Sequence, residues 1–220
     1  MRIYIVRHGE TDLNTRGCLN GRIDSKLTEN GIELAKITGE GLKDIHFDYV
    51  LSSMSSRAMI TAQLILAAND SSKNAPIYPE PRLLECAFGP WEGLCTRKDN
   101  YELTQDNWQD FFLKPFEFRG PEGVETLGEL CVRAGELLDE IIAKEGKTDK
   151  TILFSTHGCT TRALLNRFYD DPSDYWQGRC PYNCAVNIIE VKDGVAKHIG
   201  KDLIYYDESL CEDMYPIDKV

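Results

Sequence analysis

Short apolar runs alternate along this chain with longer stretches in which apolar residues recur every three or four positions. Residues 2–6 and 151–155 are runs of strand length, and each leads directly into a His-Gly pair. The helical spacing is clearest over 27–42, 57–67 and 127–142. Strands therefore alternate with helices, which favours an α/β fold with a sheet covered on both faces.

The boundaries of these segments carry residues that typically begin and end such elements. Thr28 is a suitable N-cap for the helix that follows it, and Gly146 is a suitable stop for the helix over 127–142. Residues 49–51 predict a further buried strand, which ends in a pair of serines. We expect most element boundaries to fall at these positions.

Two strand-like runs near the end of the chain, 185–191 and 195–199, flank the turn sequence Lys-Asp-Gly at 192–194. An Asp-Gly pair between two apolar runs is a strong signal for a β-hairpin. We therefore predict that the last two strands are antiparallel neighbours.

The middle of the chain has a weaker pattern. Three prolines, at 76, 79 and 81, indicate a loop, and the Gly-rich, aromatic stretch 86–94 indicates an ordered loop. Between residues 97 and 120, Trp108, Phe111 and Phe112 give the clearest signal and predict a covering helix. No repeat or low-complexity stretch interrupts the pattern, so we expect residues 1–220 to form one domain.

The composition and charge of the chain exclude some classes of binding partner. The chain of 220 residues is 42% hydrophobic, contains no apolar stretch of membrane-spanning length, and begins without a signal-peptide pattern. Its net charge of −11 repels nucleic acid and anionic membranes, so we expect neither as a partner. We expect a cytoplasmic protein that attracts any anionic substrate through a local cluster of Arg or Lys. The oligomeric state stays open.

Eight cysteines raise the questions of disulfides and metals. In a reducing cytoplasm we expect free thiols at all eight positions. Cys180 and Cys184 are spaced like half of a metal-ligand set, but no histidine lies near them, so we predict no metal site. The thiols beside the candidate site are expected to be inert, with oxidation sensitivity as the alternative; they are Cys18, Cys86 and Cys159.

The two strand-end His-Gly pairs are the clearest candidates for chemistry. His8 and His157 each follow an apolar strand, and ligands bind at the carboxyl ends of strands in open α/β sheets. The following glycines let the backbone approach a ligand closely. The other two histidines, His46 and His198, have no such setting and are expected at the surface.

Phosphoryl transfer is the chemistry that this residue set fits. Arg7 and Arg57 lie near the same sheet edge, and guanidinium groups bind phosphate oxygens in a bidentate manner. A neutral His8 is a suitable nucleophile, and a protonated His157 would donate to a phosphoryl oxygen. Glu85 is the candidate general acid, because a carboxyl group in apolar surroundings keeps its proton more readily. A solvated Glu or Arg is the ordinary alternative at each position.

Six stretches carry a resemblance to a known family over nearly the whole chain. They are Arg7-His8-Gly9-Glu10-Thr11 with Asn14; Gly21 with Leu27-Thr28-Glu29-Asn30-Gly31; Arg57-Ala58 with Thr61-Ala62; Glu85 with Phe88-Gly89 and Trp91-Glu92-Gly93; Pro121-Glu122-Gly123 with Glu125; and His157-Gly158. Together they resemble the histidine phosphatase superfamily, in its phosphoglycerate mutase-like branch. The opening stretch is the most specific of the six.

The resemblance implies a fold and a role for each residue. The fold would be a three-layer α/β/α sandwich around a mostly parallel mixed sheet. His8 would carry the phosphoryl group, Glu85 would donate the proton, and no metal or organic cofactor would be needed. The phosphate-binding set would be Arg7, Asn14, Gly21, Arg57, His157 and Gly158.

The choice between phosphatase and mutase depends on finer features. The loop over 85–93 is similar to that of the phosphatase members, and the interval before the second histidine is short, with its basic residues diluted by acids. We therefore predict hydrolysis of a small phosphorylated metabolite. A phosphoglycerate-type mutase and a non-catalytic binding module remain alternatives. The residues that would line the leaving-group side are Trp91, Phe111, Phe112, Phe116 and Phe118.

Overall fold

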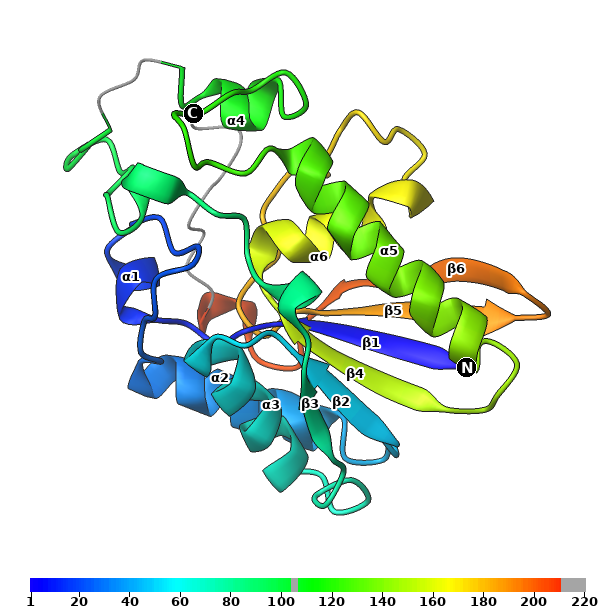
Figure 1. The fold of residues 1–220 in the computed structure, drawn as a ribbon. Helices are drawn as coiled ribbons and strands as arrows, with labels where there is room; N and C mark the ends of the chain where they lie inside the picture. Colours follow the sequence, from blue (N-terminus) through cyan, green and yellow to red (C-terminus); the bar gives the residue numbers. More distant parts are fainter. Residues whose placement is uncertain (104–106, 211–220) are drawn as a thin grey trace.

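The two apolar runs that precede the His-Gly pairs lie side by side at the centre of a six-stranded sheet (Figure 1). Strand β1 (Arg2–Arg7) pairs in parallel with β4 (Thr151–Thr156), so that Arg7 lies opposite Thr156. The computed structural model describes residues 1–103 and 107–210 and orders the strands β3-β2-β4-β1-β5-β6. Because β1 and β4 are parallel neighbours in this register, their histidines follow at the same edge.

The remaining strands extend the sheet on both sides of this central pair. β2 (Tyr49–Ser52) is parallel to β4, and β3 (Ile77–Pro79) is parallel to β2. β5 (Val186–Lys192) is antiparallel to β1 and continues through a hairpin into β6 (Val195–Leu203). The sheet is therefore mixed and mostly parallel, and the α/β fold predicted from the sequence is confirmed.

Two local predictions near the sheet edges have different outcomes. The hairpin is confirmed, and Asp193 and Gly194 have φ angles of 52° and 77°, as a two-residue turn of this kind requires. The loop predicted across the three prolines is wrong in part, because Ile77–Pro79 form the edge strand β3. Proline is tolerated there because an edge strand has one side without ladder hydrogen bonds.

The two histidines outside the predicted site were both expected at the surface, and this prediction has different outcomes for them. His46 is exposed, as expected. His198 is half-buried on β6, and its Nε2 lies 3.0 Å from Oδ1 of Asn187. Its assignment to the surface was therefore wrong, because β5 and β6 bring a polar partner to it across the hairpin.

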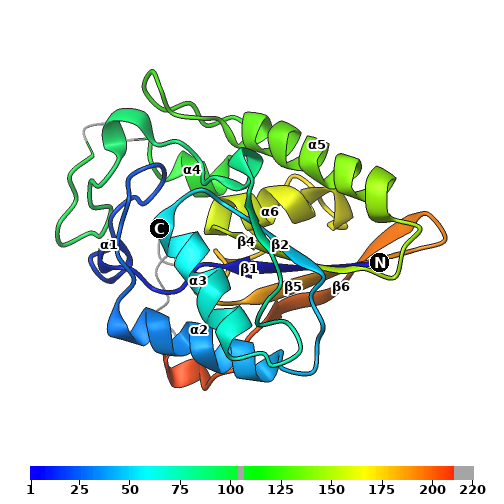
Figure 2. The ribbon, with the colours of Figure 1, turned by 60° about the horizontal axis from the view of Figure 1, so that its bottom comes forward.

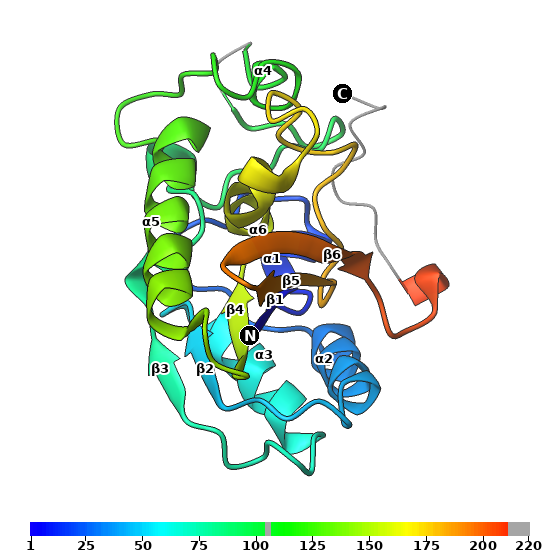
Figure 3. The same ribbon diagram turned by 90° about the vertical axis from the view of Figure 1, so that its right-hand side faces the viewer.

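Helices cover both faces of the sheet (Figure 2). α2 (Glu29–Gly41) and α3 (Ser56–Ala67) lie on one face, and α5 (Leu127–Glu145) and α6 (Gly158–Leu165) lie on the other. Figure 3 views the molecule from the N-terminal end of β1 and places α5 and α2 on opposite sides of the sheet. This is the expected three-layer arrangement. No helix in 1–103 or 107–210 is long and apolar enough to cross a membrane.

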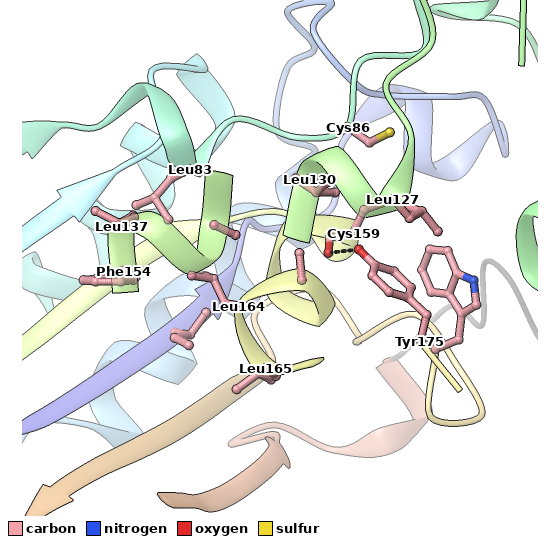
Figure 4. Close-up of a cluster of buried hydrophobic side chains, with 14 of the residues drawn as sticks. Leu83, Cys86, Leu127, Leu130, Leu137, Phe154, Cys159, Leu164, Leu165 and Tyr175 are labelled. Atoms are coloured by element: carbon pink, nitrogen blue, oxygen red, sulfur yellow. Dashed lines mark hydrogen bonds between the residues drawn. The ribbon is translucent and has the colours of Figure 1, made fainter. Parts of the chain in front are cut away.

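The predicted helix boundaries follow from capping. The side chain of Thr28 accepts a hydrogen bond from the backbone N–H of Gly31 at 2.9 Å, which begins α2. Thr126 and Glu129 form a reciprocal capping box at the start of α5, and Gly146 is its C-cap. Helix α5 packs its apolar face on the sheet and on α6, in a core that includes Leu130, Leu137, Phe154 and Leu164 (Figure 4).

Loops and short helices gather at the end of the sheet where β1 and β4 finish. They include α1 (Asp12–Thr15) and α4 (Asp110–Leu113), which lie away from the N-terminus in Figure 1. The covering helix expected to contain Trp108, Phe111 and Phe112 is confirmed only in part, because the short α4 includes the two phenylalanines and begins after Trp108. All three side chains are buried. These segments form the walls around the ends of the central strands.

A disulfide bond joins Cys18 to Cys95 across two of these loops. The prediction of free thiols is therefore wrong for this pair. The two residues face each other in an isolated antiparallel bridge, although 77 positions separate them in the chain. Among the residues that the structure describes, the free cysteines are Cys86, Cys131, Cys159, Cys180 and Cys184.

Helix α5 offers a test of the core. Leu137 is fully buried, whereas Val132 on the same helix is 62% exposed. Leu137→Ala should lower the free energy of unfolding by about 2–5 kcal/mol, because it removes buried methyl groups and leaves a cavity. Val132→Ala should change it by no more than about 0.5 kcal/mol. Urea unfolding of both variants measures the difference, and equal losses would contradict this packing.

Candidate active site

The parallel register of β1 and β4 places the two strand-end histidines together. The ring centroids of His8 and His157 are 5.1 Å apart, and both side chains are almost fully buried, at 2% and 0% exposure. The backbone N–H of His8 donates to the carbonyl of Thr156 at 2.9 Å, which continues the ladder to the end of the strands. Two imidazoles from distant parts of the sequence thus share one location.

The surroundings of His8 determine which ring nitrogen carries the proton. Its Nδ1 lies 2.7 Å from the carbonyl oxygen of Gly9, which can only accept, so Nδ1 donates and Nε2 keeps its lone pair. Burial, reinforced by the positive charges of Arg57 and Arg7, holds the pKa of His8 well below its usual 6.5. His8 therefore presents a neutral imidazole with a nucleophilic Nε2 at physiological pH.

His157 is oriented in the opposite sense. Its Nδ1 lies 3.1 Å from Nη2 of Arg57, which can only donate, so Nδ1 accepts. Its Nε2 then donates to Oγ of Ser53 at 2.8 Å. Burial and the charge of Arg57 lower the pKa of His157 well below 6.5, so these surroundings favour a neutral ring. The protonated His157 considered from the sequence is therefore disfavoured here, first by burial and then by the nearby guanidinium groups.

Arg57 is buried beside His157 and held by backbone carbonyl groups. Its guanidinium donates to the carbonyl oxygens of Asn20, Gly21 and Ile23 at 3.0, 2.8 and 2.9 Å. Burial lowers the pKa of Arg57 to about 10, which still leaves it charged at neutral pH. A fixed positive charge therefore lies next to His157, as the position of Arg57 after β2 predicted.

Arg7 supplies the second guanidinium. It is 5% exposed, and its Nη1 donates to the carbonyl oxygen of Pro181. In both Arg7 and Arg57 the buried Nε has no hydrogen-bond partner within the described residues. Buried donors are nearly always paired, so two unpaired guanidinium N–H groups beside His8 are consistent with a site that binds an anion.

Glu85 lies at the N-terminus of helix α6, on the other side of the site. Its carboxylate accepts from the backbone N–H groups of Cys86, Cys159 and Thr160 at 2.9–3.0 Å. The side chain is 6% exposed. Gly158 lies between Glu85 and Arg7, and a Cβ on Gly158 would come within 2.5 Å of Sγ of Cys180. A glycine at 158 therefore lets the helix start, the acid and the arginine approach one another.

Asn14 and Gly21 have different positions in the site. Oδ1 of Asn14 accepts from Asn183 Nδ2 at 3.3 Å and from the backbone N–H of Thr11 at 3.1 Å. Asn14 is one of the residues that line the pocket, and no hydrogen bond within the described residues uses its Nδ2. Gly21 holds Arg57 through its carbonyl oxygen and does not line the pocket. Any effect of Gly21 on phosphate would therefore act through Arg57.

A pocket opens from His8 toward the surrounding loops. It contains about 460 Å³ of space not filled by protein atoms, its open mouth included. Of the predicted site residues, Arg7, His8, Asn14, Glu85 and Gly158 line it, whereas Gly21, Arg57 and His157 are not among the lining residues. The rest of the lining is mostly apolar and includes the aromatic residues Phe88, Trp108, Phe111, Phe112 and Trp176.

The aromatic lining was predicted only in part. Phe111 and Phe112 line the pocket. Trp91 and Phe118 do not, although both are buried in contact with the ring of Trp108, and Phe116 is not part of the lining either. Trp176 was missed; its Nε1 donates to the carbonyl oxygen of Phe111 at 3.0 Å, which fixes the indole against α4. No periodicity near residue 176 indicated this contact.

Other hydrogen-bond partners in the site were also not predicted from the sequence. Asn183 Nδ2 donates to the carbonyl oxygen of His8 at 2.9 Å, and Pro181 accepts from Arg7. Ser53 orients His157. Ser53 follows a predicted strand, so the strand-end rule contained a signal for it. Asn183 and Pro181 had none, because their place depends on β5 lying beside β1.

The cysteines near the site are poor candidates for redox chemistry through thiolates. Burial raises the pKa of Cys86 and of Cys159 well above 9.0, so both remain protonated thiols. Cys18 is in the disulfide with Cys95. These three residues therefore do not supply the exposed, low-pKa thiol that the oxidation hypothesis needs. In 1–103 and 107–210 no three His, Cys, Asp or Glu side chains form a metal-binding group.

Comparison with known proteins now identifies the family. The histidine phosphatase superfamily (branch 1) matches residues 3–199. The chain belongs to the histidine phosphatase superfamily. Phosphoester hydrolysis is the activity that this membership and the phosphatase-named relatives support.

Individual relatives of this histidine phosphatase include phosphatases and mutases. An adenosylcobalamin/alpha-ribazole phosphatase of Salmonella typhimurium is 42% identical over 195 residues, which is 86% of this chain and 92% of the relative. A 2,3-bisphosphoglycerate-dependent phosphoglycerate mutase of Cytophaga hutchinsonii is 30% identical over 166 residues, with coverages of 74% and 75%. The solved structure of YhfR from Bacillus stearothermophilus matches with a TM-score of 0.80 and 30% identity, covering 92% of this chain and 97% of that one.

The lowered pKa values of the two histidines have a measurable consequence for this histidine phosphatase. Unfolded imidazoles take up protons near pH 6.5, but folded His8 and His157 do so only at lower pH. Falling pH therefore favours the unfolded chain, so this contribution to stability is complete above about pH 6.5 and is lost toward acid.

We expect His8→Gln to lose less stability than the wild type between pH 7.5 and 5. The two slopes should differ by up to about 1.4 kcal/mol per pH unit. Urea unfolding across that range measures both slopes, and carboxylates common to both proteins cancel in the comparison. Identical slopes would contradict the buried, neutral state of His8.

Proposed function

We propose that this enzyme hydrolyses small phosphomonoesters through a phosphohistidine on Nε2 of His8. The observation that carries the proposal is a neutral imidazole whose Nδ1 is occupied by Gly9, next to two buried guanidinium groups with unpaired Nε atoms. Such an arrangement pairs a nucleophile with the positive charge that a phosphoryl group needs. Asn14 Nδ2 would add a neutral donor to the same oxygens.

In the first step, Nε2 of His8 attacks phosphorus and the bond to the ester oxygen breaks. The phosphoryl oxygens are bound by Arg7 and Arg57, and His157 keeps Arg57 in place. The leaving oxygen takes a proton from the carboxyl group of Glu85 and departs as an alcohol. Water then attacks phosphorus, Glu85 takes a proton from it, and the bond from phosphorus to His8 breaks to give orthophosphate.

The pocket walls support hydrolysis over mutase chemistry. Arg7 is the only cation among the described residues that line the pocket, and five aromatic side chains form much of the remainder. A mutase must hold a second anionic group while its bisphosphate intermediate turns around, which calls for further cations. We therefore propose a substrate with one phosphoryl group and an apolar or ring-bearing alcohol. The relative named as an alpha-ribazole phosphatase supports this choice.

Several other predictions accompany this proposal. A cytoplasmic location, independence from metals, and the lack of a nucleic-acid partner remain predictions from the sequence. The mutase alternative retains support from the relative named as a phosphoglycerate mutase. A non-catalytic binding module is disfavoured, since Arg7, His8, Arg57, Glu85 and His157 are all present and gathered in one place.

The phosphohistidine is tested by trapping. Brief exposure of the enzyme to a ³²P-labelled ester, followed by a denaturing quench, should yield an acid-labile, alkali-stable phosphoryl group that maps to His8. His8→Ala should carry no label, and its kcat/KM should fall by about 10³-fold or more because the nucleophile is lost. His46→Ala, on the exposed surface, is the matched control. Hydrolysis without label on His8 would refute the mechanism.

The substrate class is tested by a panel of esters assayed for released phosphate. We expect kcat/KM to be at least about 10-fold higher for alpha-ribazole 5′-phosphate and aryl phosphates than for 3-phosphoglycerate, because the walls offer stacking but no second anion site. Trp176→Ala should reduce this preference. Faster isomerisation of 3-phosphoglycerate than release of its phosphate would favour the mutase instead.

A further inference from the structure

Glu92 holds one loop of the site by an unusual concentration of backbone hydrogen bonds. Its carboxylate accepts from the N–H groups of Gly21, Arg22 and Ile23 at 3.0, 2.7 and 3.3 Å. A fourth bond, at 3.0 Å, comes from the N–H of Phe88, which lines the pocket. Three successive N–H groups that converge on one carboxylate fix the conformation of residues 20–23, here named the arginine loop.

The opposite side of the arginine loop holds Arg57. The carbonyl oxygens of Asn20, Gly21 and Ile23 accept the hydrogen bonds of its guanidinium. The loop therefore presents its N–H groups to Glu92 and its C=O groups to Arg57. Because both sets of bonds depend on the same few peptide planes, a shift of the loop at Glu92 would shift the acceptors of Arg57.

The electrostatics and the packing support the same linkage. Burial lowers the pKa of Arg57, and the carboxylates of Glu85, Asp24 and Glu92 oppose this effect. A Cβ on Gly21 would come within 2.4 Å of both Oε1 of Glu92 and the carbonyl oxygen of Cys86. The arginine loop is thus pressed against the segment that carries Glu85 and Phe88, and Glu92 lies at the junction.

We propose that Glu92 is a positioning residue for phosphoryl transfer, which aligns Arg57 and, through it, His157 by holding the arginine loop. This inference rests on the proposed function. Glu92 does not line the pocket, so it acts on the reacting group only through the loop and Arg57. The side chain of Arg57 then needs no reorganisation when charge develops on the phosphoryl oxygens.

The first test compares Glu92→Gln with the wild type. The amide keeps the size of the side chain but loses the charge and replaces one acceptor oxygen by a donor, which repels a backbone N–H. We expect kcat/KM to fall by about 10- to 100-fold, as small displacements of a catalytic group produce. The inhibition constant for vanadate, an analogue of the transition state, should rise by a similar factor.

A double-mutant cycle separates positioning from a general loss of structure. If Glu92 acts through Arg57, then adding Glu92→Gln to Arg57→Lys should lower kcat/KM by less than about threefold further. If the loss of kcat/KM in the double variant equals the product of the losses in the two single variants, the proposal is overturned. So would an unchanged kcat/KM in Glu92→Gln. Should that variant fail to fold, Glu92→Asp, which keeps the charge but shortens the side chain, enters the same cycle.

The matched control is Glu129→Gln. Glu129 also accepts a backbone N–H with its carboxylate, at 2.9 Å from Thr126, but it caps α5 at an exposed position. Its kcat/KM should stay within about twofold of the wild type.

Orthophosphate binding, measured by calorimetry in wild type and Glu92→Gln, tests the linkage without turnover. Loss of phosphate affinity in the variant supports it, equal affinity overturns it, and a wild type that binds phosphate but hydrolyses no ester refutes only the proposed function.

Discussion

The parallel pairing of β1 with β4 is the constraint on which the rest of the site depends. Because Arg7 lies opposite Thr156, β1 and β4 end at the same level of the sheet, and His8 and His157 are the next residues after these strands. Both strands are almost wholly buried, and alternate side chains of β1 pack in different core clusters, Ile3 and Ile5 in one and Tyr4 and Val6 in the other. A shift of register by one residue would exchange these two sets. The same burial that fixes the core therefore fixes the spacing of the two imidazoles.

The site combines buried polar and charged side chains, and burying such groups costs free energy unless each has a hydrogen-bond or charge partner. Arg57 is fully buried and is held by carbonyl oxygens rather than by a directly paired carboxylate. The pKa values of the two histidines are lowered first by burial, which disfavours the charged imidazolium, and then by the charges of Arg57 and Arg7, so both rings stay neutral. The result is a net positive, rigid environment around a neutral nucleophile. An anionic phosphoryl group complements that environment, in which hydrogen bonds to charged groups are strong.

The proposed preference for a ring-bearing ester depends on the pocket walls and not on the residues that end β1 and β4. Relatives named as phosphatases and relatives named as mutases both match most of the length of this chain. Apart from Phe88, the aromatic side chains around His8 are contributed by the segment around α4 and by Trp176, which lie outside the motifs. Aromatic surfaces of this kind favour an uncharged ring over a second anion. The overall negative charge of the protein adds to this, because only a local positive site retains an anion.

The sequence by itself determined the alternation of strands and helices, the N-cap of α2, the end of α5 at Gly146, the hairpin, and the candidate residues that end β1 and β4. These follow from local periodicity, from capping chemistry and from motifs a few residues long. Only the tertiary structure decided that Cys18 meets Cys95, that β3 joins the sheet edge, that His198 finds Asn187, and that Trp176 closes the pocket. It also decided that Glu92 and Arg57 share one loop. Each of these contacts joins segments that are remote in the chain, and their meeting depends on strand order and register, which local patterns do not encode.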